Sequence, residues 1–344
     1  MHISEFDYEL PDDLIAQQPL TQRDASRMLV LDRQTATWTD SVFREFPQHL
    51  RPNDVVVVNN SRVIPARLSG HRHETGGAVE IFLVRELGPR IWEALVRPGG
   101  RLRAGARVVF GDGTLIGELL DEPGHELRRV RFHCDASFEE VIEKLGSTPL
   151  PPYIKRAGGD TSEDRERYQT VYSKNPGAIA APTAGLHFTD AILNEVRARA
   201  SVAEVTLHVG YGTFEPVRVD DVDQHSVSSE HFVISEETAA TINRARSNGG
   251  RVIVVGTTTM RAVESAADES GHVAAMSGEA SLTIKPGYRF RVADALLTNF
   301  HLPRSSLLVL VSAFAGRELV LSAYGHAVEQ RYRFYSYGDC MFIL

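Results

Sequence analysis

The sequence predicts an α/β protein in which a barrel-like α/β catalytic domain carries a small inserted all-β domain. Short continuous apolar runs at 28–32 and 55–58 are typical of strands buried on both faces, which need covering helices. After Leu68 the pattern changes to short, partly alternating segments separated by glycine-rich turns. We therefore expect residues 1–66 and 150–344 to form one discontinuous α/β domain, and residues 67–149 to form an inserted β-barrel.

The insert is predicted from five short segments, at 79–84, 91–96, 107–110, 114–120 and 127–133. Ser137 and Glu140 have the spacing of a capping box and predict one short helix that ends at Gly146. The proline-rich segment 148–152 suits neither a helix nor a central strand, so we interpret it as the return linker.

The rest of the chain alternates strands and helices. Strands are expected at 178–181, 205–209, 252–255 and 295–298, with a last strand at 341–344. The helices between them are expected to begin near Thr189, at the N-cap Ser235, in the segment that holds Arg261 and Glu264, and after Pro303, followed by a final helix at 318–331. Such repeated units require parallel pairing, in an α/β barrel or an open sheet.

The composition limits the class of protein. Cys134 and Cys340 are the only cysteines, too few for a disulfide framework or a four-cysteine zinc site. The first ten residues have no apolar signal segment, and no stretch approaches the ~18 apolar residues of a membrane span. We expect a soluble cytoplasmic protein with no membrane partner, acting as a monomer.

The net charge of −8 means that any contact with nucleic acid must depend on local basic patches. One such patch has four arginines and no acidic residue between them: Arg97, Arg101, Arg103 and Arg107. They either contact phosphates or protect a solvated hairpin edge. Three further arginines are the next candidates for RNA binding: Arg27, Arg62 and Arg333.

Ligands of parallel α/β sheets bind beyond the carboxyl ends of the strands, where loops and helix N-termini meet. At one such end Gly256 precedes Thr257, Thr258 and Thr259, whose hydroxyls and N–H groups suit a carboxylate or phosphate, although they could simply cap the helix. Gly210, Tyr211 and Gly212 either let the backbone approach a ligand or form a tight turn. Neither a dinucleotide motif nor a P-loop is present.

Histidines lie at or just past the predicted strand ends. His187, His208 and His301 suit general-base chemistry, and each could also be structural. His225, Glu230 and His231 are residue types that bind zinc, but their spacing fits no helical metalloprotease pattern. We expect no metal and interpret these residues as polar contacts with the ligand.

The loops resemble those of one family, the S-adenosylmethionine:tRNA ribosyltransferase-isomerases of queuosine biosynthesis. The matching segments lie along almost the whole chain: 23–32, 59–68, 149–154, 168–170, 180–188, 207–214, 256–261 with Glu264, 298–303 and 332–339. One departure is that Val227 and Ser228 replace the methionine and second histidine of the usual His-x-Met-His-x-Glu pattern. We therefore treat His225 and Glu230 as the stronger catalytic candidates of this motif, and we assign no catalytic role to Ser228.

The resemblance implies that S-adenosylmethionine donates its ribose to 7-aminomethyl-7-deazaguanine at the tRNA wobble position. Adenine and methionine leave, and the ribose rearranges. The catalytic candidates are His187, His208, His225, Glu230 and His301. The cofactor-binding candidates are Thr183, Gly185, Phe188, Gly210, Tyr211, Gly212, Thr257, Thr258, Thr259, Arg261 and Asn299, with Phe188, Tyr211 or Phe300 stacking on adenine.

Two rival functions remain open from the sequence. A methyltransferase that uses the same cofactor would have a glycine-rich loop after its first strand, which neither 28–32 nor 55–58 has. A non-catalytic RNA-binding module would be expected to be basic. The products separate the three: S-adenosylhomocysteine, free adenine, or neither.

Overall fold

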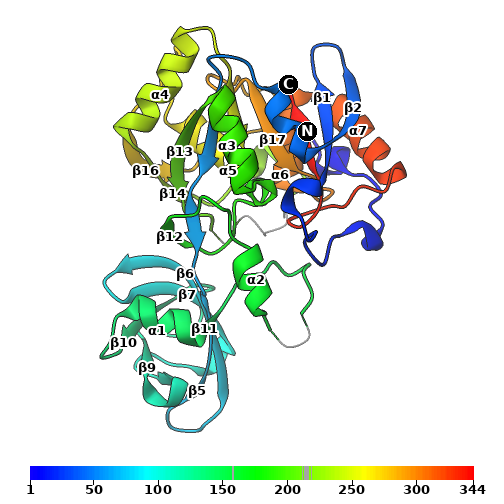
Figure 1. The fold of residues 1–344 in the computed structure, drawn as a ribbon. Helices are drawn as coiled ribbons and strands as arrows, with labels where there is room; N and C mark the ends of the chain where they lie inside the picture. The colour runs from blue at the N-terminus through cyan, green and yellow to red at the C-terminus, as the bar shows by residue number, and fades with distance from the viewer. Residues whose placement is uncertain (157–158, 211, 213–216, 218) are drawn as a thin grey trace.

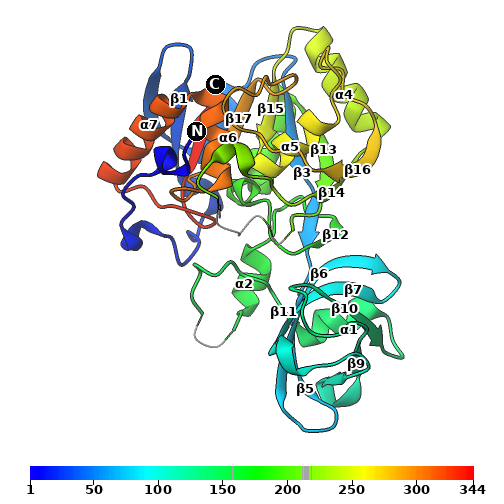
Figure 2. The ribbon, with the colours of Figure 1, turned by 180° about the vertical axis from the view of Figure 1, so that it is seen from behind.

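The computed structural model describes residues 1–156, 159–210, 212, 217 and 219–344. The chain forms two lobes, a large α/β lobe and a small β-barrel, joined at one edge of the large lobe (Figure 1). The view from behind also shows the two lobes as separate bodies (Figure 2). Among the described residues no single helix is long and apolar enough to cross a membrane. Only the pair α6 (Ser306–Ala315) and α7 (Arg317–Glu329) passes that test together, and it is bent by 115°.

A nine-stranded sheet forms the centre of the large lobe, in the order β16-β14-β13-β3-β15-β17-β18-β1-β2. Strands β13, β3, β15 and β17 run parallel to one another, whereas β14 and β18 run antiparallel to their neighbours β13 and β17. The strands are β1 (Arg27–Asp32), β2 (Thr37–Val42), β3 (Val55–Asn59), β13 (Ser201–Leu207), β14 (Glu230–Ile234), β15 (Val252–Val255), β16 (Met276–Ala280), β17 (Ala295–Asn299) and β18 (Cys340–Ile343).

Helices cover both faces of this sheet. One face packs against α4 (Glu236–Ser247), α5 (Thr257–Ser265), α6 (Ser306–Ala315) and α7 (Arg317–Glu329). The other face packs against α3 (Asp190–Arg199) and the 3-10 helix η4 (Phe43–His49). Strand β3 has helices on both sides, and its four valines have no exposed surface. This explains its continuous apolar sequence.

The small lobe is a closed barrel, in the order β5-β6-β7-β10-β9-β8, with β8 pairing back to β5 and β11 added beside β5. Its elements are β5 (Arg67–Arg72), β6 (Ala78–Gly88), β7 (Ile91–Arg97), β8 (Arg107–Phe110), β9 (Leu115–Leu119), β10 (Arg128–His133), α1 (Phe138–Leu145) and β11 (Gly146–Ser147). Alternate residues of β10 are buried, as expected for strands with one face in a core.

The connection between the lobes contains a short two-stranded sheet of β4 (Ser61–Val63) and β12 (Asn175–Ala178), together with α2 (Ser162–Arg167). Further short 3-10 helices are η1 (Ile3–Phe6), η2 (Asp12–Leu14), η3 (Arg23–Ala25), η5 (Gly99–Arg101), η6 (Gly111–Gly113), η7 (Thr183–His187) and η9 (Val222–Gln224). Because β3 leads through β4 into β5, the carboxyl ends of the parallel strands lie on the side that faces the barrel (Figure 1).

The predicted class, an α/β domain with an inserted β-barrel, is confirmed. Of the two predicted alternatives, an α/β barrel and an open sheet, the large lobe has the open sheet. Among the described residues its strand order ends at β16 and β2 and does not close. The prediction of a strand of the main sheet at 178–181 is wrong. Of these residues only Ala178 is extended, at the end of β12, and β12 pairs with β4. The exact domain boundaries stay a prediction.

Candidate functional site

A cavity of about 460 Å³ lies beyond the carboxyl ends of β15 and β17. Residues from four segments line it: Pro152 and Tyr153 from the return linker, Ala180 to Ala184, Gly256 to Thr258, and Thr298 to Leu307. Tyr335 and Ser336 complete the wall. The cavity therefore lies where ligands of parallel sheets bind, and segments between Pro152 and Ser336 form it.

The N-terminus of α5 forms one side of this cavity. Gly256, with φ 90°, precedes the first turn, whose N–H groups have no acceptor within the helix. Thr257 and Thr258 are buried and line the cavity, and neither hydroxyl has a hydrogen-bond partner among the described residues. The Thr259 hydroxyl instead donates to the Val255 carbonyl at 2.6 Å and faces the core. This end of the helix can bind an anion through Thr257 and Thr258.

Asn299, at the end of the neighbouring strand β17, also lines this cavity. Its Nδ2 group contacts His187 Nε2 at 3.3 Å and the carbonyls of Tyr335 and Asp339 at 3.1 and 3.5 Å. Its Oδ1 atom is buried and has no partner among the described residues. His187 does not line the cavity: it lies behind Asn299, where burial and the charges of Arg23 and Arg333 lower its pKa to about 3.

Aromatic side chains surround the same region. The rings of Tyr153 and Tyr335 lie 3.9 Å apart between centroids, and Tyr153 Oη is 2.5 Å from Ser336 Oγ. Phe300 lines the cavity but is packed against Tyr324 and Tyr332. Among the predicted stacking residues, Phe188 lies in the core beside Phe43 and Phe46, away from the cavity, and Tyr211 lies outside the described residues.

His301 is the predicted catalytic histidine that lines this cavity. Its Nε2 atom is 2.8 Å from Thr298 Oγ1, and Tyr324 Oη accepts a hydrogen bond from its backbone N–H. Burial lowers the pKa of His301 to about 3, so its ring is neutral near pH 7. His301 can contact a ligand as a neutral hydrogen-bonding group.

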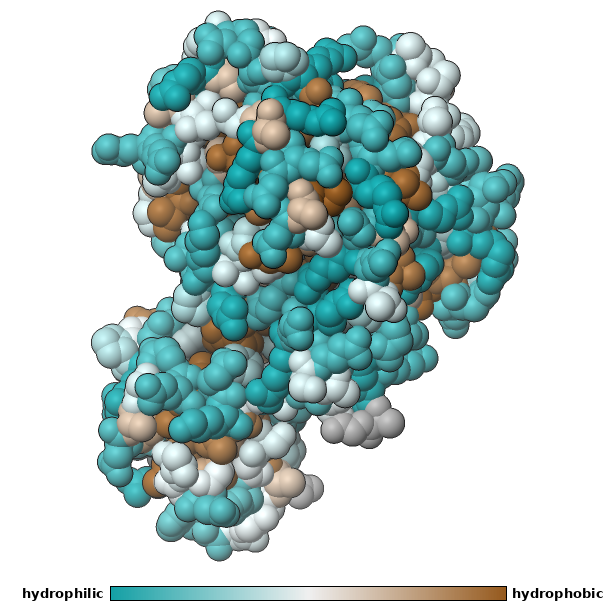
Figure 3. All heavy atoms as spheres, viewed as in Figure 1, coloured by the Kyte–Doolittle hydropathy of each residue, from teal (hydrophilic) through white to brown (hydrophobic). Residues whose placement is uncertain are grey.

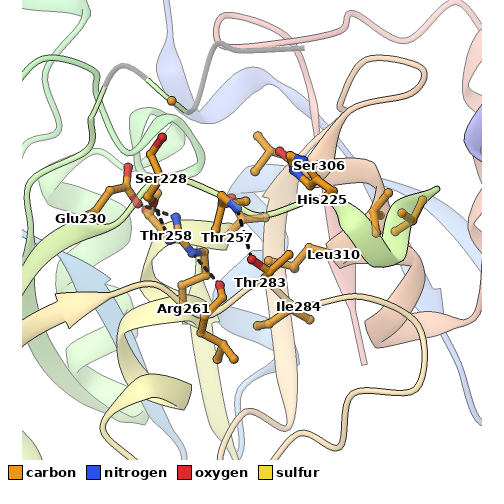
Figure 4. A pocket seen from close by; sticks show the side chains of 16 residues that line it. His225, Ser228, Glu230, Thr257, Thr258, Arg261, Thr283, Ile284, Ser306 and Leu310 are labelled. Carbon is orange, nitrogen blue, oxygen red and sulfur yellow. Dashed lines mark hydrogen bonds and ion pairs between the residues drawn. The ribbon is translucent and has the colours of Figure 1, made fainter. Parts of the chain in front are cut away.

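A smaller cavity of about 30 Å³ shares Thr257, Thr258, Ser306 and Leu307 with the first (Figure 4). His225 and Glu230 line it. The Nε2 atom of His225 is buried without a partner among the described residues, and burial, then the charge of Lys285, lowers the His225 pKa. A neutral imidazole with a free ring nitrogen is able to accept a proton.

Among the described residues, two donors hold Glu230 in place. Its Oε2 atom accepts from Arg261 Nη1 at 2.6 Å, and its Oε1 atom accepts from the Gly210 N–H at 2.9 Å. The other Arg261 nitrogens donate to the carbonyls of Leu282, Ser228 and Ala280. Since these partners occupy most of its donors, Arg261 holds Glu230 in position and has little capacity left for a ligand.

A third, more open cleft of about 990 Å³ lies between the lobes and shares Gly212, Ser228 and Glu230 with the small cavity. Its barrel side includes Trp92, and its α/β side includes His208 and Gly210. Burial lowers the His208 pKa, followed by the nearby His231. Figure 3 shows hydrophobic residues where the two lobes meet. The three spaces therefore adjoin, with Glu230, Thr257 and Thr258 at their junctions.

The remaining predicted site residues are spread more widely. Thr183 lines the 460 Å³ cavity. Gly185 instead packs so closely against the Tyr172 hydroxyl that a Cβ atom at position 185 would clash with it. Arg97, Arg103 and Arg107 are exposed on the barrel, and the Arg101 side chain lies outside the described residues. In the antiparallel register of β6 and β7, Arg97 lies opposite Glu80, near the start of β6. Glu86 and Trp92, which line the cleft, lie at the other end of this hairpin. None of the three described arginines lines the cleft.

The other arginine candidates differ in their surroundings. Arg62 is exposed in the connection between the lobes. Arg27 lies over the Tyr332 ring at 3.7 Å and donates to the Gln330 carbonyl. Arg333 is half-buried, and burial lowers its pKa. Among the described residues no three His, Cys, Asp or Glu side chains group as a metal site would require.

Sequence reasoning did not propose Tyr153, Tyr335, Ser306 or Leu307 as site residues, although all four line the large cavity. Tyr335 has a positive φ of 74°, an unusual conformation for a tyrosine. The signal available in the sequence was the group of tyrosines in segment 332–337. It was not used, because clustered aromatic residues near a chain end are often assigned to packing alone.

Comparisons with known proteins agree over the full chain. The family model described as "Queuosine biosynthesis protein" matches residues 3–343. The S-adenosylmethionine:tRNA ribosyltransferase-isomerases of Symbiobacterium thermophilum and Clostridioides difficile are 50% and 49% identical to this chain, with 100% of each chain covered. A crystal structure of S-adenosylmethionine tRNA ribosyltransferase from Thermotoga maritima has a TM-score of 0.56 at 36% identity, covering 99% of this chain and 100% of that one. This chain belongs to the queuosine biosynthesis protein family, as a transferase of the ribosyltransferase-isomerase type.

Proposed function

We propose that this enzyme transfers the ribosyl group of S-adenosylmethionine to 7-aminomethyl-7-deazaguanine at the tRNA wobble position and isomerises it. The product is epoxyqueuosine-tRNA, and adenine and methionine are released. The names of the relatives support S-adenosylmethionine and tRNA as the two substrates. The resemblance of the loops described above supports the acceptor base and the product.

The observation that carries this proposal is the pair of adjoining spaces at the strand ends. The 460 Å³ cavity has a size and a lining of apolar, aromatic and hydroxyl side chains that suit a nucleoside linked to an amino acid. Its α5 end suits the methionine carboxylate. The 990 Å³ cleft is open to solvent and suits a base that is turned out of an RNA loop.

His225 is our candidate for the general base. The sulfonium makes the protons on the adjacent 5′ carbon more acidic, and a neutral imidazole beside both spaces can remove one of them. Glu230 lies in the same small cavity, where its carboxylate accepts hydrogen bonds from Arg261 and the Gly210 N–H. That carboxylate suits an incoming aminomethyl group, which is a cation near pH 7.

The direct test supplies S-adenosylmethionine and tRNA that carries the aminomethyl base, and measures free adenine and methionine. Replacement of His225 by alanine should lower kcat by about 10²–10⁴, the usual contribution of a general base. His272→Ala, at an exposed histidine, is the matched control. Formation of S-adenosylhomocysteine in place of adenine would identify a methyltransferase and refute the proposal.

A further inference from the structure

We infer that a pocket between α2 and β4 binds the sugar–phosphate backbone of the tRNA anticodon loop. This pocket has a volume of about 530 Å³. It shares no lining residue with the three spaces described above, so it is a separate site. The inference rests on the proposed function in one respect, that tRNA is a substrate.

Residues of both lobes line the pocket. Glu143 belongs to α1 of the barrel lobe, whereas Ser162 belongs to α2 and Ser173 to the segment that precedes β12. Three arginines complete the polar lining: Arg23, Arg62 and Arg165. Guanidinium and hydroxyl groups are the usual partners of the phosphate and sugar oxygens of a nucleic acid.

Arg62 is the exposed arginine of this pocket. It lies in β4 between the buried residues Ser61 and Val63, so the alternation of the strand turns its side chain outward. The Arg62 guanidinium has no hydrogen-bond or ion-pair partner among the described residues. Its donors are therefore available to a ligand.

Arg23 is half-buried and has no carboxylate partner within the described part of the chain. Its guanidinium donates to the backbone carbonyls of Gln169 at 2.7 Å and Glu166 at 3.1 Å. Burial, and then the charge of Arg167, lowers the pKa of Arg23. An anion in the pocket would stabilise this charge, because it would supply the missing counter-ion.

Hydrogen bonds hold the walls of the pocket together. The Gln169 side chain accepts from the Val63 N–H at 3.0 Å and donates to the Val63 carbonyl at 2.8 Å, which fixes β4 beside the segment after α2. Arg165 donates to the carbonyls of Glu143 and Gly146, and so ties α2 to the barrel lobe. The pocket is therefore formed before a ligand binds, which lowers the entropic cost of binding.

The pocket and the 990 Å³ cleft differ in charge. Among the described residues, five glutamates and one arginine line the cleft, and that arginine, Arg85, pairs with Glu93 at 2.8 Å. Three arginines and two glutamates line the pocket, where Arg165 pairs with Asp160 at 3.0 Å. The cleft therefore repels a phosphate and suits the cationic aminomethyl base, whereas the pocket attracts a phosphate.

The cleft and the pocket flank the two-stranded ribbon of β4 and β12. Pro176 of β12 lines the cleft, and its partner in the parallel register, Arg62 of β4, lines the pocket. Paired strands lie about 4.8 Å apart. Figures 1 and 2 show α2 on one side of this connection and the β6–β7 hairpin on the other. An RNA loop that inserts its wobble base into the cleft and crosses the ribbon thus brings a nearby phosphate to Arg62.

The experiment measures how the full-length enzyme binds an anticodon stem–loop RNA that carries the aminomethyl base, without S-adenosylmethionine. Fluorescence anisotropy at several salt concentrations gives the affinity and its salt slope. Arg62→Gln should weaken binding about tenfold and flatten the slope of log K against log salt by about 0.7, the effect of one phosphate contact in a single strand. Glu166→Gln removes an exposed negative charge from the pocket and should strengthen binding about twofold or more.

Arg199→Gln is the matched control for Arg62→Gln. Arg199 is also exposed, and it precedes β13, at the end of the parallel strands opposite to the pocket. This variant should keep the wild-type affinity, and urea denaturation should show that all three variants are folded. Wild-type affinity in Arg62→Gln, an equal loss in Arg199→Gln, or no gain in Glu166→Gln would overturn the inference.

A phosphate scan tests whether the RNA backbone is the ligand. Each phosphate of the loop is replaced in turn by a neutral methylphosphonate. The wild type should lose affinity at one or two adjacent positions, and Arg62→Gln should be insensitive at the same positions. Equal losses in both proteins at every position would overturn the inference. Binding of inorganic phosphate without any Arg62-dependent position would identify a site for free phosphate and overturn the assignment to RNA.

Adenine release from S-adenosylmethionine and tRNA by the wild type tests the proposed function separately. Adenine release together with unchanged RNA binding by Arg62→Gln would refute the role of the pocket and leave the proposed function standing. Absence of adenine release together with Arg62-dependent binding at defined phosphates would refute the reaction and support the pocket as a backbone site.

Discussion

Thr257, Thr258 and Thr259 follow one another at the start of α5, yet their hydroxyls have different surroundings. Thr257 and Thr258 line the cavity, and Thr259 donates to the Val255 carbonyl within the core. We expect Thr257→Val and Thr258→Val to raise the S-adenosylmethionine KM by about 2–10-fold each, because each variant removes one hydrogen bond to the ligand.

Thr259→Val is the matched control for these two variants. It should lower the free energy of unfolding by about 1 kcal/mol and change the KM by less than about twofold. Steady-state kinetics and urea denaturation separate the two effects. A KM that rises most in Thr259→Val would show that the anion does not bind at this end of α5.

His187 and His301 should make the protein sensitive to acid. Burial lowers the pKa of each to about 3, whereas both titrate near 6.5 when unfolded. The unfolded state therefore binds more protons below pH 6.5, so stability falls as the pH falls from about 6.5 towards 3. Each histidine contributes a slope of up to about 1.4 kcal/mol per pH unit.

Urea denaturation at several pH values between 5 and 7 measures this slope. Replacing His301 by glutamine should flatten it, because one of the histidines with a lowered pKa is gone. An unchanged slope in a folded His301→Gln variant would mean that other groups control the acid sensitivity.

Glu264 connects α5 to the segment that leads into β17. Its carboxylate accepts hydrogen bonds from the backbone N–H groups of Arg291, Val292 and Ala293 at 2.9–3.0 Å, and from the Tyr288 hydroxyl at 3.0 Å. Glu264→Ala leaves these buried donors without an acceptor, so we expect a loss of about 3–5 kcal/mol in the free energy of unfolding. Glu269→Ala, at an exposed site, should stay within about 0.5 kcal/mol. Equal losses in both variants would contradict this role.

Elements with strong local signals were predicted well. Helix α4 begins after the N-cap Ser235 as expected, and β8 and β15 have the predicted bounds. Strands β2, β14 and β16 were missed, because they contain exposed residues and lie near one edge or the other of the sheet. The apolar residues at 179–181 follow a strand pattern, but they are buried beside a cavity, a tertiary effect that local propensity does not reveal.

The predicted tRNA contact lies on the surface of the barrel. Arg97, Arg103 and Arg107 are exposed on the barrel, away from the cleft, and we keep the prediction that they and Arg101 bind tRNA phosphates. Replacing all four by glutamine should weaken tRNA binding. For each phosphate that is no longer neutralised, the slope of log K against log salt should flatten by about 0.9 in duplex RNA, or by about 0.7 in a single strand.

Cofactor affinity should be unchanged, since none of the three described arginines of the patch lines the cavity. A control variant replaces three exposed arginines of α3 and α4, Arg197, Arg199 and Arg244. Wild-type tRNA affinity and salt slope in the first variant would identify the patch as surface charge, and the RNA would then lie against the α/β lobe.

The site as a whole was predicted in its place but not in its detail. Loops at the ends of β15 and β17 were expected to meet, and they do. The three histidines at the predicted strand ends were expected on one face, whereas His187 lies behind Asn299, and His208 and His301 line different spaces. Strand order and side-chain direction decide this, and neither can be read from residue spacing in one sequence.

The pairing of Arg67 with Ser147 and of Leu68 with Gly146 brings the two ends of the barrel together. All of the barrel strands lie between these residues, so this lobe can complete its own pairing during synthesis before β13, β15 and β17 leave the ribosome. Once formed, it holds the flanking chain as a short connection, and β3 then meets its later neighbours at a smaller entropic cost. The barrel would thus act as an early folding unit that shortens the search of the larger lobe.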